Sequence, residues 1–195
     1  MGRWEPNARG RLAEAALELY SERGFEQTTV AEIARRAGLT ERTFFRHYAD
    51  KREVLFSGVV PLRDLFTRAV ADAPGAAAPV DAVALGLEAL GEAFPSDRRA
   101  FSRVRQEVIT ANAELQEREL VKLASMADEL ADTLRARGVS EPAASLAAEA
   151  GIAVFKVAFE RWIGADEEGG LAPLIREALA ELKAVLAPGR GAGVV

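Results

Sequence analysis

Hydrophobic residues recur at helical spacing along almost the whole of this 195-residue chain, and no stretch alternates polar and apolar residues as a half-buried strand does. Glycine and proline interrupt the recurrence at points that suit helix ends. The chain is therefore predicted to be all-α, with about nine helices. Their expected ranges are 8–23, 29–37, 40–48, 50–70, 80–94, 96–110, 113–137, 142–163 and 171–186.

Capping residues support the starts of the second, third and fourth helices. Thr29 opens a capping box with the glutamate three residues later, and Thr40 suits the N-cap of the third helix. Asp50 repeats the capping-box spacing. A long fourth helix is therefore expected to begin there, with Pro61 as a kink inside it.

The composition excludes several kinds of site. Cysteine is absent and His47 is the single histidine, so disulfides, thiolate metal sites and Cys nucleophiles are excluded, and a metal site on His47 lacks a second strong ligand. The sequence has no Gly-x-Ser-x-Gly motif and no phosphate-binding Gly-Lys-Ser/Thr loop. We expect neither an enzyme nor a cofactor or metal, although catalysis by carboxylates alone stays open.

The sequence predicts a cytoplasmic protein without a membrane partner. No apolar run reaches the ~18 residues of a membrane span, and the first residues lack the apolar stretch of a signal peptide.

Charge is distributed unevenly along the chain, whose formal net charge is −5. Residues 35–52 hold six Lys/Arg against two Asp/Glu, which fits an anionic partner, although a solvated charged face would give the same count. The expected organisation is a basic N-terminal domain at 1–52, a larger helical domain at 53–187 and a disordered glycine-rich tail at 188–195.

The second and third helices, joined by a short turn at Gly38, have the form of a helix-turn-helix. If Phe44 and Tyr48 face inward, the polar residues of the third helix are left on its free face. Arginine can bond guanine bidentately, and a threonine methyl can meet a thymine methyl. Lys51 and Arg52 would lie in the first turn of the fourth helix, where the helix dipole disfavours cations, so a phosphate is their expected partner.

The run TTVAEIARRAGLTERTFFRHYADKREVL at 28–55, with RGRLAEAALELYSERGFEQ before it, resembles the DNA-binding domain of TetR-family transcriptional regulators. The resemblance covers about 9–56 and implies that the later helices bind ligand and form a dimer. Phe45 stands where the family usually has tyrosine, so a hydroxyl that could bond phosphate is missing. The resemblance implies DNA contacts by Thr29, Thr40, Arg42, Thr43, Phe45, Arg46, His47 and Lys51.

The function expected from this resemblance is a ligand-responsive regulator of transcription. A repressor is favoured, released from a palindromic double-stranded operator by a small apolar or acidic effector. The stretch 113–162 resembles the subgroup of the family that binds acyl-CoA-like ligands. The alternative is a protein-interaction module built on a degenerate helix-turn-helix, without specific DNA binding.

Arg105 lies on the apolar face of its predicted helix, and a buried arginine needs an anion. An internal carboxylate or an acidic group of the effector could supply it. Aromatic residues at helical spacing fit a ligand pocket, although an ordinary core explains the same spacing. The predicted lining of the effector site is Leu62, Phe66, Phe101, Arg105, Ile109, Met126, Phe155 and Phe159.

The last two helices predict a homodimer. The final helix carries an unbroken apolar stripe, and the helix before it is apolar on two sides, so a two-fold four-helix interface would cover both. The residues expected there are Val154, Val157, Arg161, Leu171, Leu174, Ile175, Ala178, Leu179 and Leu182.

Overall fold

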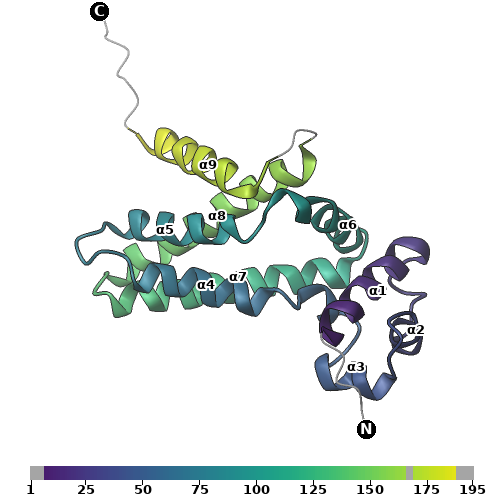
Figure 1. Cartoon of the computed structure of the whole chain (residues 1–195). Helices are drawn as coiled ribbons and strands as arrows, with labels where there is room; N and C mark the ends of the chain where they lie inside the picture. The colour runs from purple at the N-terminus through teal and green to yellow at the C-terminus, as the bar shows by residue number, and fades with distance from the viewer. Residues whose placement is uncertain (1–6, 166–168, 188–195) are drawn as a thin grey trace, which may run out of the picture. The chain divides into compact units, whose positions relative to one another are not determined.

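The computed structural model describes residues 7–165 and 169–187, and within these ranges every regular element is helical (Figure 1). The predicted all-α fold is confirmed. The predicted disordered tail lies outside the described residues. The elements are α1 (Ala8–Arg23), α2 (Val30–Arg36), α3 (Glu41–His47), the 3₁₀ helices η1 (Glu53–Phe56) and η2 (Ser96–Arg98), α4 (Val59–Ala71), α5 (Pro79–Glu92), α6 (Arg99–Thr110), α7 (Ala113–Ala136), α8 (Glu141–Gly164) and α9 (Leu171–Leu186).

The chain forms two compact units that are not consecutive in sequence. The first unit holds the residues up to Leu62 and, in addition, Ala100–Ala124, which is most of α6 with the first half of α7. The second unit holds Arg63–Arg99 and the residues from Ser125 onward. Helix α7 therefore contributes one half to each unit.

The prediction of a single long fourth helix from Asp50 onward is wrong. Asp50 does act as a cap, because its Oδ1 accepts hydrogen bonds from the backbone N–H groups of Arg52 (2.8 Å) and Glu53 (3.1 Å). The turn it opens is the short η1, and α4 begins separately at Val59. Pro61 lies in the first turn of α4, where a missing N–H costs no helical hydrogen bond, so it is not the expected interior kink.

The core of the first unit lies between α1, α2, α3 and η1. Leu12, Ile33 and Phe44 are fully buried there. Ile109 of α6 and Leu115 of α7 bury their side chains in the same core, which explains why this later segment belongs to the first unit. The helix-turn-helix is thus built on a core to which distant parts of the sequence contribute.

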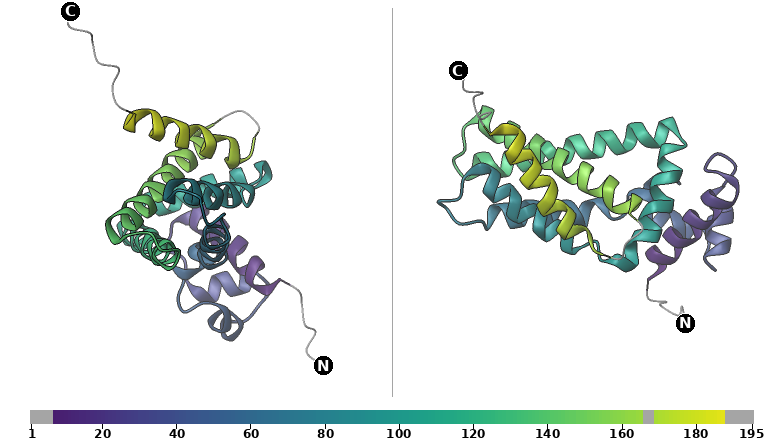
Figure 2. Two further views of the ribbon diagram at one scale, coloured as in Figure 1. Left: turned by 90° about the vertical axis from the view of Figure 1, so that its left-hand side faces the viewer. Right: turned by 90° about the horizontal axis from the view of Figure 1, so that it is seen from above.

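The second unit is organised around α5, α8 and α9, which pack against one another in pairs (Figure 2). Glycine permits close approach at two of these contacts, since a Cβ on Gly91 would lie 2.7 Å from Cα of Ala172 and one on Gly151 would lie 2.6 Å from Val83. By length and composition α8 could cross a membrane. Eight of its residues are buried, Gly151 and Val154 among them, whereas Leu146 is 71 % exposed and Val157 is 47 % exposed.

The apolar stripe of α9 is largely used within its own chain. Leu171, Ile175 and Ala178 are buried, as is Val154 of α8, because α9 packs on α5 and α8. These four residues are therefore not available to a second copy in this arrangement. Val157 is 47 % exposed. The remaining apolar residues predicted for the interface, Leu174, Leu179 and Leu182, are half-buried.

Candidate nucleic-acid interface

Local capping forms the helix-turn-helix. At the start of α2 the N–H of Glu32 donates to Oγ1 of Thr29 (3.3 Å), and the N–H of Thr29 donates to the Glu32 carboxylate (2.9 Å), which completes the predicted capping box. Gly38 has a φ of +67° in the turn. Helix α3 then begins at Thr40, whose Oγ1 accepts from the N–H of Thr43 at 3.2 Å. Each of these interactions spans only a few residues.

Helix α3 is anchored by its two inward aromatic residues. Phe44 is fully buried and Tyr48 is 4 % exposed, with their ring centroids 5.5 Å apart. The Tyr48 hydroxyl donates to the carbonyl of Arg9 (3.0 Å), which ties the end of α3 to the start of α1. The opposite face of α3 is left free of the core.

That free face carries the residues predicted to read bases. Arg42 and Arg46 are exposed, Phe45 is 56 % exposed and Thr43 is half-buried. No carboxylate of the described residues pairs with either arginine. The exposure is what a groove-reading face requires, and the DNA contacts themselves stay a prediction.

Thr29 and Thr40, two of the residues predicted to contact DNA, already have interactions within the chain. The Thr29 hydroxyl lies 2.7 Å from the Glu32 carboxylate, and its hydrogen bonds hold the pKa of Glu32 below its ordinary value. The Thr40 hydroxyl lies 3.0 Å from that of Thr43. Nε2 of His47 is enclosed by protein without a hydrogen-bond partner among the described residues, so a phosphate contact from His47 would fall to Nδ1.

Lys51 fastens the segment after α3 to the loop after α1. Its Nζ donates to the carbonyls of Phe25 (2.9 Å), Glu26 (3.3 Å) and Thr28 (3.1 Å) and lies 4.2 Å from the centre of the Phe25 ring. These carbonyls use all three N–H groups of the ammonium. The sequence indicated that this cation needs a partner; the main chain supplies three acceptors, and the phosphate contact stays a prediction.

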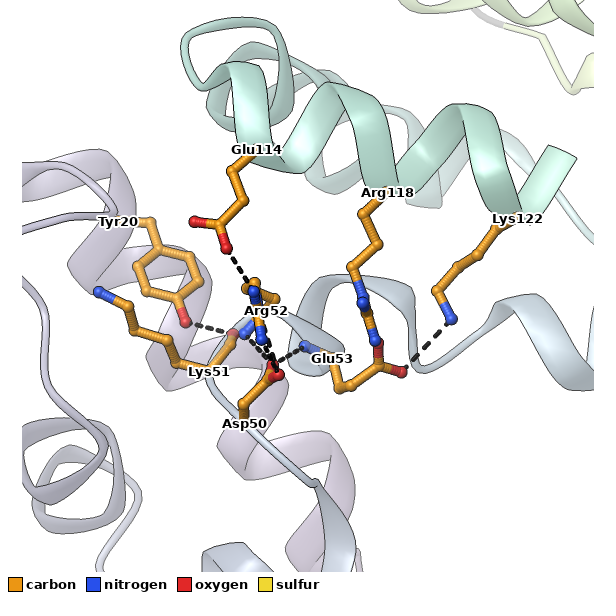
Figure 3. Close-up of polar contacts among 8 residues, drawn as sticks. All are labelled: Tyr20, Asp50, Lys51, Arg52, Glu53, Glu114, Arg118 and Lys122. Carbon is orange, nitrogen blue, oxygen red and sulfur yellow. Dashed lines mark hydrogen bonds and ion pairs between the residues drawn. The ribbon is translucent and has the colours of Figure 1, made fainter.

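A set of charged side chains joins the segment after α3 to the first half of α7 (Figure 3). Arg52 donates to the Asp50 carboxylate and pairs with Glu114. Burial raises the pKa of Asp50, but the hydrogen bonds from Arg52 and from backbone N–H groups outweigh it and leave this pKa below its ordinary value. We call the whole set the charge cluster; its members are Asp50, Arg52, Glu53, Glu114, Arg118 and Lys122.

Sequence reasoning missed the α7 half of this cluster. Glu53 pairs with Arg118 and with Lys122, the latter at 3.4 Å, although these partners are 65 and 69 residues away. A charge on one helix carries no local signal of a partner so distant in sequence. The cluster fixes the segment that follows α3 through ionic contacts, which salt weakens.

Arg105 has an internal partner. Its Nε donates to the carbonyl of Leu55 (2.7 Å), its guanidinium pairs with Glu119 (3.2 Å) and it lies 5.3 Å from the centre of the Phe56 ring. Burial lowers the pKa of Arg105, and the charge of Glu119 opposes that effect. Of the two anions left open by the sequence, the structure supplies the carboxylate.

The residues predicted to line an effector site are divided between the two units. Leu62, Phe101, Arg105 and Ile109 belong to the first unit, and Phe66, Met126, Phe155 and Phe159 belong to the second. Phe66 and Ile109 are fully buried in the cores. In the second unit, Phe155 and Phe159 are half-buried and surround Phe94 together with Trp162, with ring centroids between 5.6 and 6.1 Å apart.

Two family descriptions match this chain. Residues 12–57 match the description of bacterial regulatory proteins of the tetR family, and residues 77–187 match the MftR C-terminal domain. The first match begins at Leu12 inside α1 and covers α2, α3 and η1. The second covers more than half of the chain and contains α5 to α9. Both matches point to regulators rather than enzymes, in agreement with the sequence.

The chain is also similar to individual transcriptional regulators. The transcriptional regulator TcmR of Streptomyces glaucescens is 36 % identical over 97 residues, which are 50 % of this chain and 38 % of TcmR, so the match spans less than half of that relative. SmeT, the repressor of the Stenotrophomonas maltophilia multidrug efflux pump SmeDEF, has a TM-score of 0.58 at 22 % identity, over 91 % of this chain and 89 % of SmeT.

A second solved structure, the regulator FadR of Bacillus subtilis in complex with stearoyl-CoA, has a TM-score of 0.57 at 20 % identity, over 89 % of this chain and 96 % of FadR. At these identities the two structures establish the fold alone. Together with the matched domains, they lead to one conclusion: the chain belongs to the TetR family of bacterial regulatory proteins, and its C-terminal domain is of the MftR type.

Proposed function

We propose that this protein is a homodimeric repressor in the bacterial cytoplasm that binds a palindromic operator through α3 and is released by a small apolar or acidic effector. One observation carries the proposal. Helix α3 is anchored by Phe44 and Tyr48, while Arg42 and Arg46 project from the core without an internal partner among the described residues. Phe45 is 56 % exposed beside them, in edge contact with the Phe44 ring. A rigid helix with a free cationic face is what major-groove reading needs.

The proposed roles follow from the hydrogen-bond donors and apolar groups that each side chain leaves exposed. The guanidinium groups of Arg42 and Arg46 pair with no carboxylate in residues 7–165 and 169–187 and would bond guanine edges, and Thr43 beside them would meet a thymine methyl. Phe45 adds apolar contact with sugar or thymine. The proposed backbone contacts come from Thr29, Thr40, His47 and Lys51, and for Lys51 the phosphate would compete with three internal carbonyls.

The proposed dimer uses the parts of α8 and α9 that the chain leaves uncovered. Val157 is exposed, and Leu174, Leu179 and Leu182 are half-buried. Arg161 already pairs with Glu177 at 2.8 Å and would lie at the rim of such an interface. A two-fold dimer would place two copies of α3 about 34–36 Å apart, or a multiple of that repeat. Sedimentation as a monomer at micromolar concentration would contradict this part.

The function is tested by selection from randomised duplexes, followed by binding measurements over a range of salt concentrations. Arg42→Ala should relax base preference at one position of each half-site and cost about 1–3 kcal/mol per bidentate pair lost. Arg68→Ala, an exposed arginine of α4 in the second unit, is the matched control. An unchanged sequence preference in Arg42→Ala would remove this residue from base reading.

The alternative, a protein-interaction module on the same fold, predicts no enriched duplex and no salt-dependent affinity for DNA. The exposed cationic face of α3 favours the DNA-binding regulator, because a protein-binding helix would more commonly present an apolar stripe.

The effector is proposed to contact the aromatic residues of the second unit. Phe155 and Phe159 are half-buried beside Phe94, so part of each ring remains available to a ligand. Thermal-shift screening tests which ligands bind there, with fatty acids, aromatic acids and acyl-CoA thioesters as the compounds. The thioesters are included because FadR was solved with stearoyl-CoA. Phe159→Ala should reduce both the shift and operator release. Release by a compound whose effect is unchanged in Phe159→Ala would place the effector elsewhere.

A further inference from the structure

Helix α3 carries an acidic residue on the face that is proposed to read bases. Glu41 is exposed, as are Arg42, Phe45 and Arg46. Successive residues of an α-helix are about 100° apart, so these four side chains lie within about 140° of the helix circumference. The fully buried Phe44 lies outside this sector. Glu41 therefore shares its face with the two arginines.

The Glu41 carboxylate forms no ion pair with any cation in residues 7–165 and 169–187. The spacing along α3 explains why the arginines of the same face do not neutralise it. Side chains on a helix meet at separations of three or four residues, whereas Arg42 is adjacent to Glu41 and Arg46 lies five positions on. The residue four positions on is the apolar Phe45. The face thus presents one carboxylate and two guanidinium groups that do not pair with one another.

A carboxylate in the first turn of a helix is also favoured by the helix dipole, which requires no DNA. The capping of α3, however, is already supplied by Thr40, whose Oγ1 accepts the N–H of Thr43 at 3.2 Å. On a face that approaches DNA, a carboxylate is repelled by the phosphates. A hydrogen bond from a base would offset this repulsion.

We propose that Glu41 determines operator specificity by accepting a hydrogen bond from N4 of a cytosine in the major groove. This inference rests on the function proposed above. A carboxylate only accepts, and the N4 amino group of cytosine is the base donor that acidic side chains read. The guanidinium groups of Arg42 and Arg46 only donate, which suits guanine. Each half-site is therefore expected to contain cytosine as well as guanine.

Selection from randomised duplexes compares the full-length wild type with Glu41→Gln and Glu41→Ala. We expect the wild type to prefer cytosine at one position of each half-site. Glutamine can bond N6 and N7 of adenine, so Glu41→Gln should shift that position to adenine, and Glu41→Ala should leave it without a preferred base.

Affinity measurements on two fixed duplexes give a second readout. On the wild-type operator both variants should bind about five- to twentyfold more weakly, as for a mismatched base pair. On an unrelated duplex both should bind about two- to threefold more tightly, because a negative charge near the phosphates has been removed. Unchanged affinity on both duplexes would contradict a position of Glu41 at the DNA.

Glu117→Gln is the matched control, because it removes an exposed carboxylate of α7 within the first unit. This control should keep the preferred sequence and both affinities. Urea denaturation of all variants separates base reading from a dipole role, since loss of the dipole interaction alone would lower stability without altering the preferred base. An unchanged cytosine preference in Glu41→Gln, or the same shift in Glu117→Gln, would overturn the proposal.

The wild-type selection distinguishes failure of the proposed function from failure of the Glu41 role. If the wild type enriches no duplex, the DNA-binding function fails and the role of Glu41 fails with it. If the wild type enriches a duplex and Glu41→Gln enriches the same sequence, the function stands and only the role of Glu41 fails.

Discussion

The hydroxyl of Tyr20 donates a 2.6 Å hydrogen bond to the main-chain carbonyl of Lys51. Tyr20 is 2 % exposed near the end of α1, so this bond fixes the segment after α3 to a buried point of the first unit. Burial, together with the charge of Asp50, raises the pKa of Tyr20. The phenol therefore stays protonated, and remains a donor, throughout the pH range in which proteins are usually handled.

Replacing Tyr20 by phenylalanine keeps the ring and removes the donor. We expect Tyr20→Phe to lower the free energy of unfolding by about 1–2 kcal/mol, because the Lys51 carbonyl loses its partner in a site of low water access. Urea denaturation followed by circular dichroism measures the loss. An unchanged midpoint would mean that water replaces the hydroxyl at this carbonyl.

Lys51→Met keeps a long side chain over Phe25 and removes the ammonium that binds three carbonyls. The expected loss in the free energy of unfolding is about 1.5–3 kcal/mol, as for hydrogen bonds from a charged group. Lys156→Met, at an exposed position of α8, is the control and should be nearly neutral. If Lys51 also contacts phosphate, the slope of log K for operator binding against log salt concentration should become shallower by about one in the same variant. A fully stable Lys51→Met protein would show that the internal bonds contribute nothing.

Thr40→Ala removes the cap of α3. Its Oγ1 accepts the N–H of Thr43, and loss of such a cap costs about 0.5–2 kcal/mol. Thr40→Ser retains the acceptor and should retain most of the stability. Thermal unfolding of the two variants, with Thr110→Ala at an exposed position as a control for loss of a threonine, tests the assignment. Equal stability of Thr40→Ala and Thr40→Ser would contradict it.

Gly91→Ala places a methyl group against main chain rather than against a movable side chain. The added Cβ would lie 2.7 Å from Cα of Ala172, so α5 and α9 must separate, at a cost of about 1–3 kcal/mol. Gly75→Ala, between α4 and α5, has nothing within 4 Å of the added Cβ and serves as the control. Differential scanning calorimetry should show a lower unfolding temperature for Gly91→Ala alone. Equal unfolding temperatures would contradict the close helix contact.

Asp50→Asn tests the charge cluster through pH. The folded protein holds the pKa of Asp50 below its ordinary 3.8, so the stability from this carboxylate is complete above that value. The stability is lost as pH falls through the lower folded pKa. The asparagine variant keeps an oxygen for the cap, and its stability should vary less with pH between about 5 and 2. Denaturation curves across this range measure the difference, and parallel pH profiles would show that Asp50 contributes no charge-dependent stability.

Much of the helix-turn-helix could be predicted from the sequence because the interactions that define it are local. The capping box at Thr29, the cap at Thr40 and the inward spacing of Phe44 and Tyr48 each depend on residues within about four positions. The exposed face of α3 follows from the same spacing. This local pattern, matched to a family, also gave the functional class.

Contacts between distant segments could be decided only by the tertiary structure. The sequence showed that Arg105 and Lys51 need partners, but choosing among carboxylate, carbonyl, ligand and phosphate requires knowing which groups lie nearby. The break between η1 and α4 has the same origin, because η1 is held by the core of the first unit and by α7 rather than by its own helical propensity.

The apolar stripe of α9 shows a question that the sequence pattern cannot decide, namely which surface covers the stripe. Its spacing correctly predicts a buried helix face, but burial against α5 and α8 and burial against a second copy leave the same pattern in the sequence. The sequence by itself determined the all-α fold, the helix-turn-helix and its free cationic face, since these depend on periodicity and capping. Tertiary structure decided which helix covers each stripe and which anion or carbonyl meets each buried cation, because those energies depend on distances that only the packed chain defines.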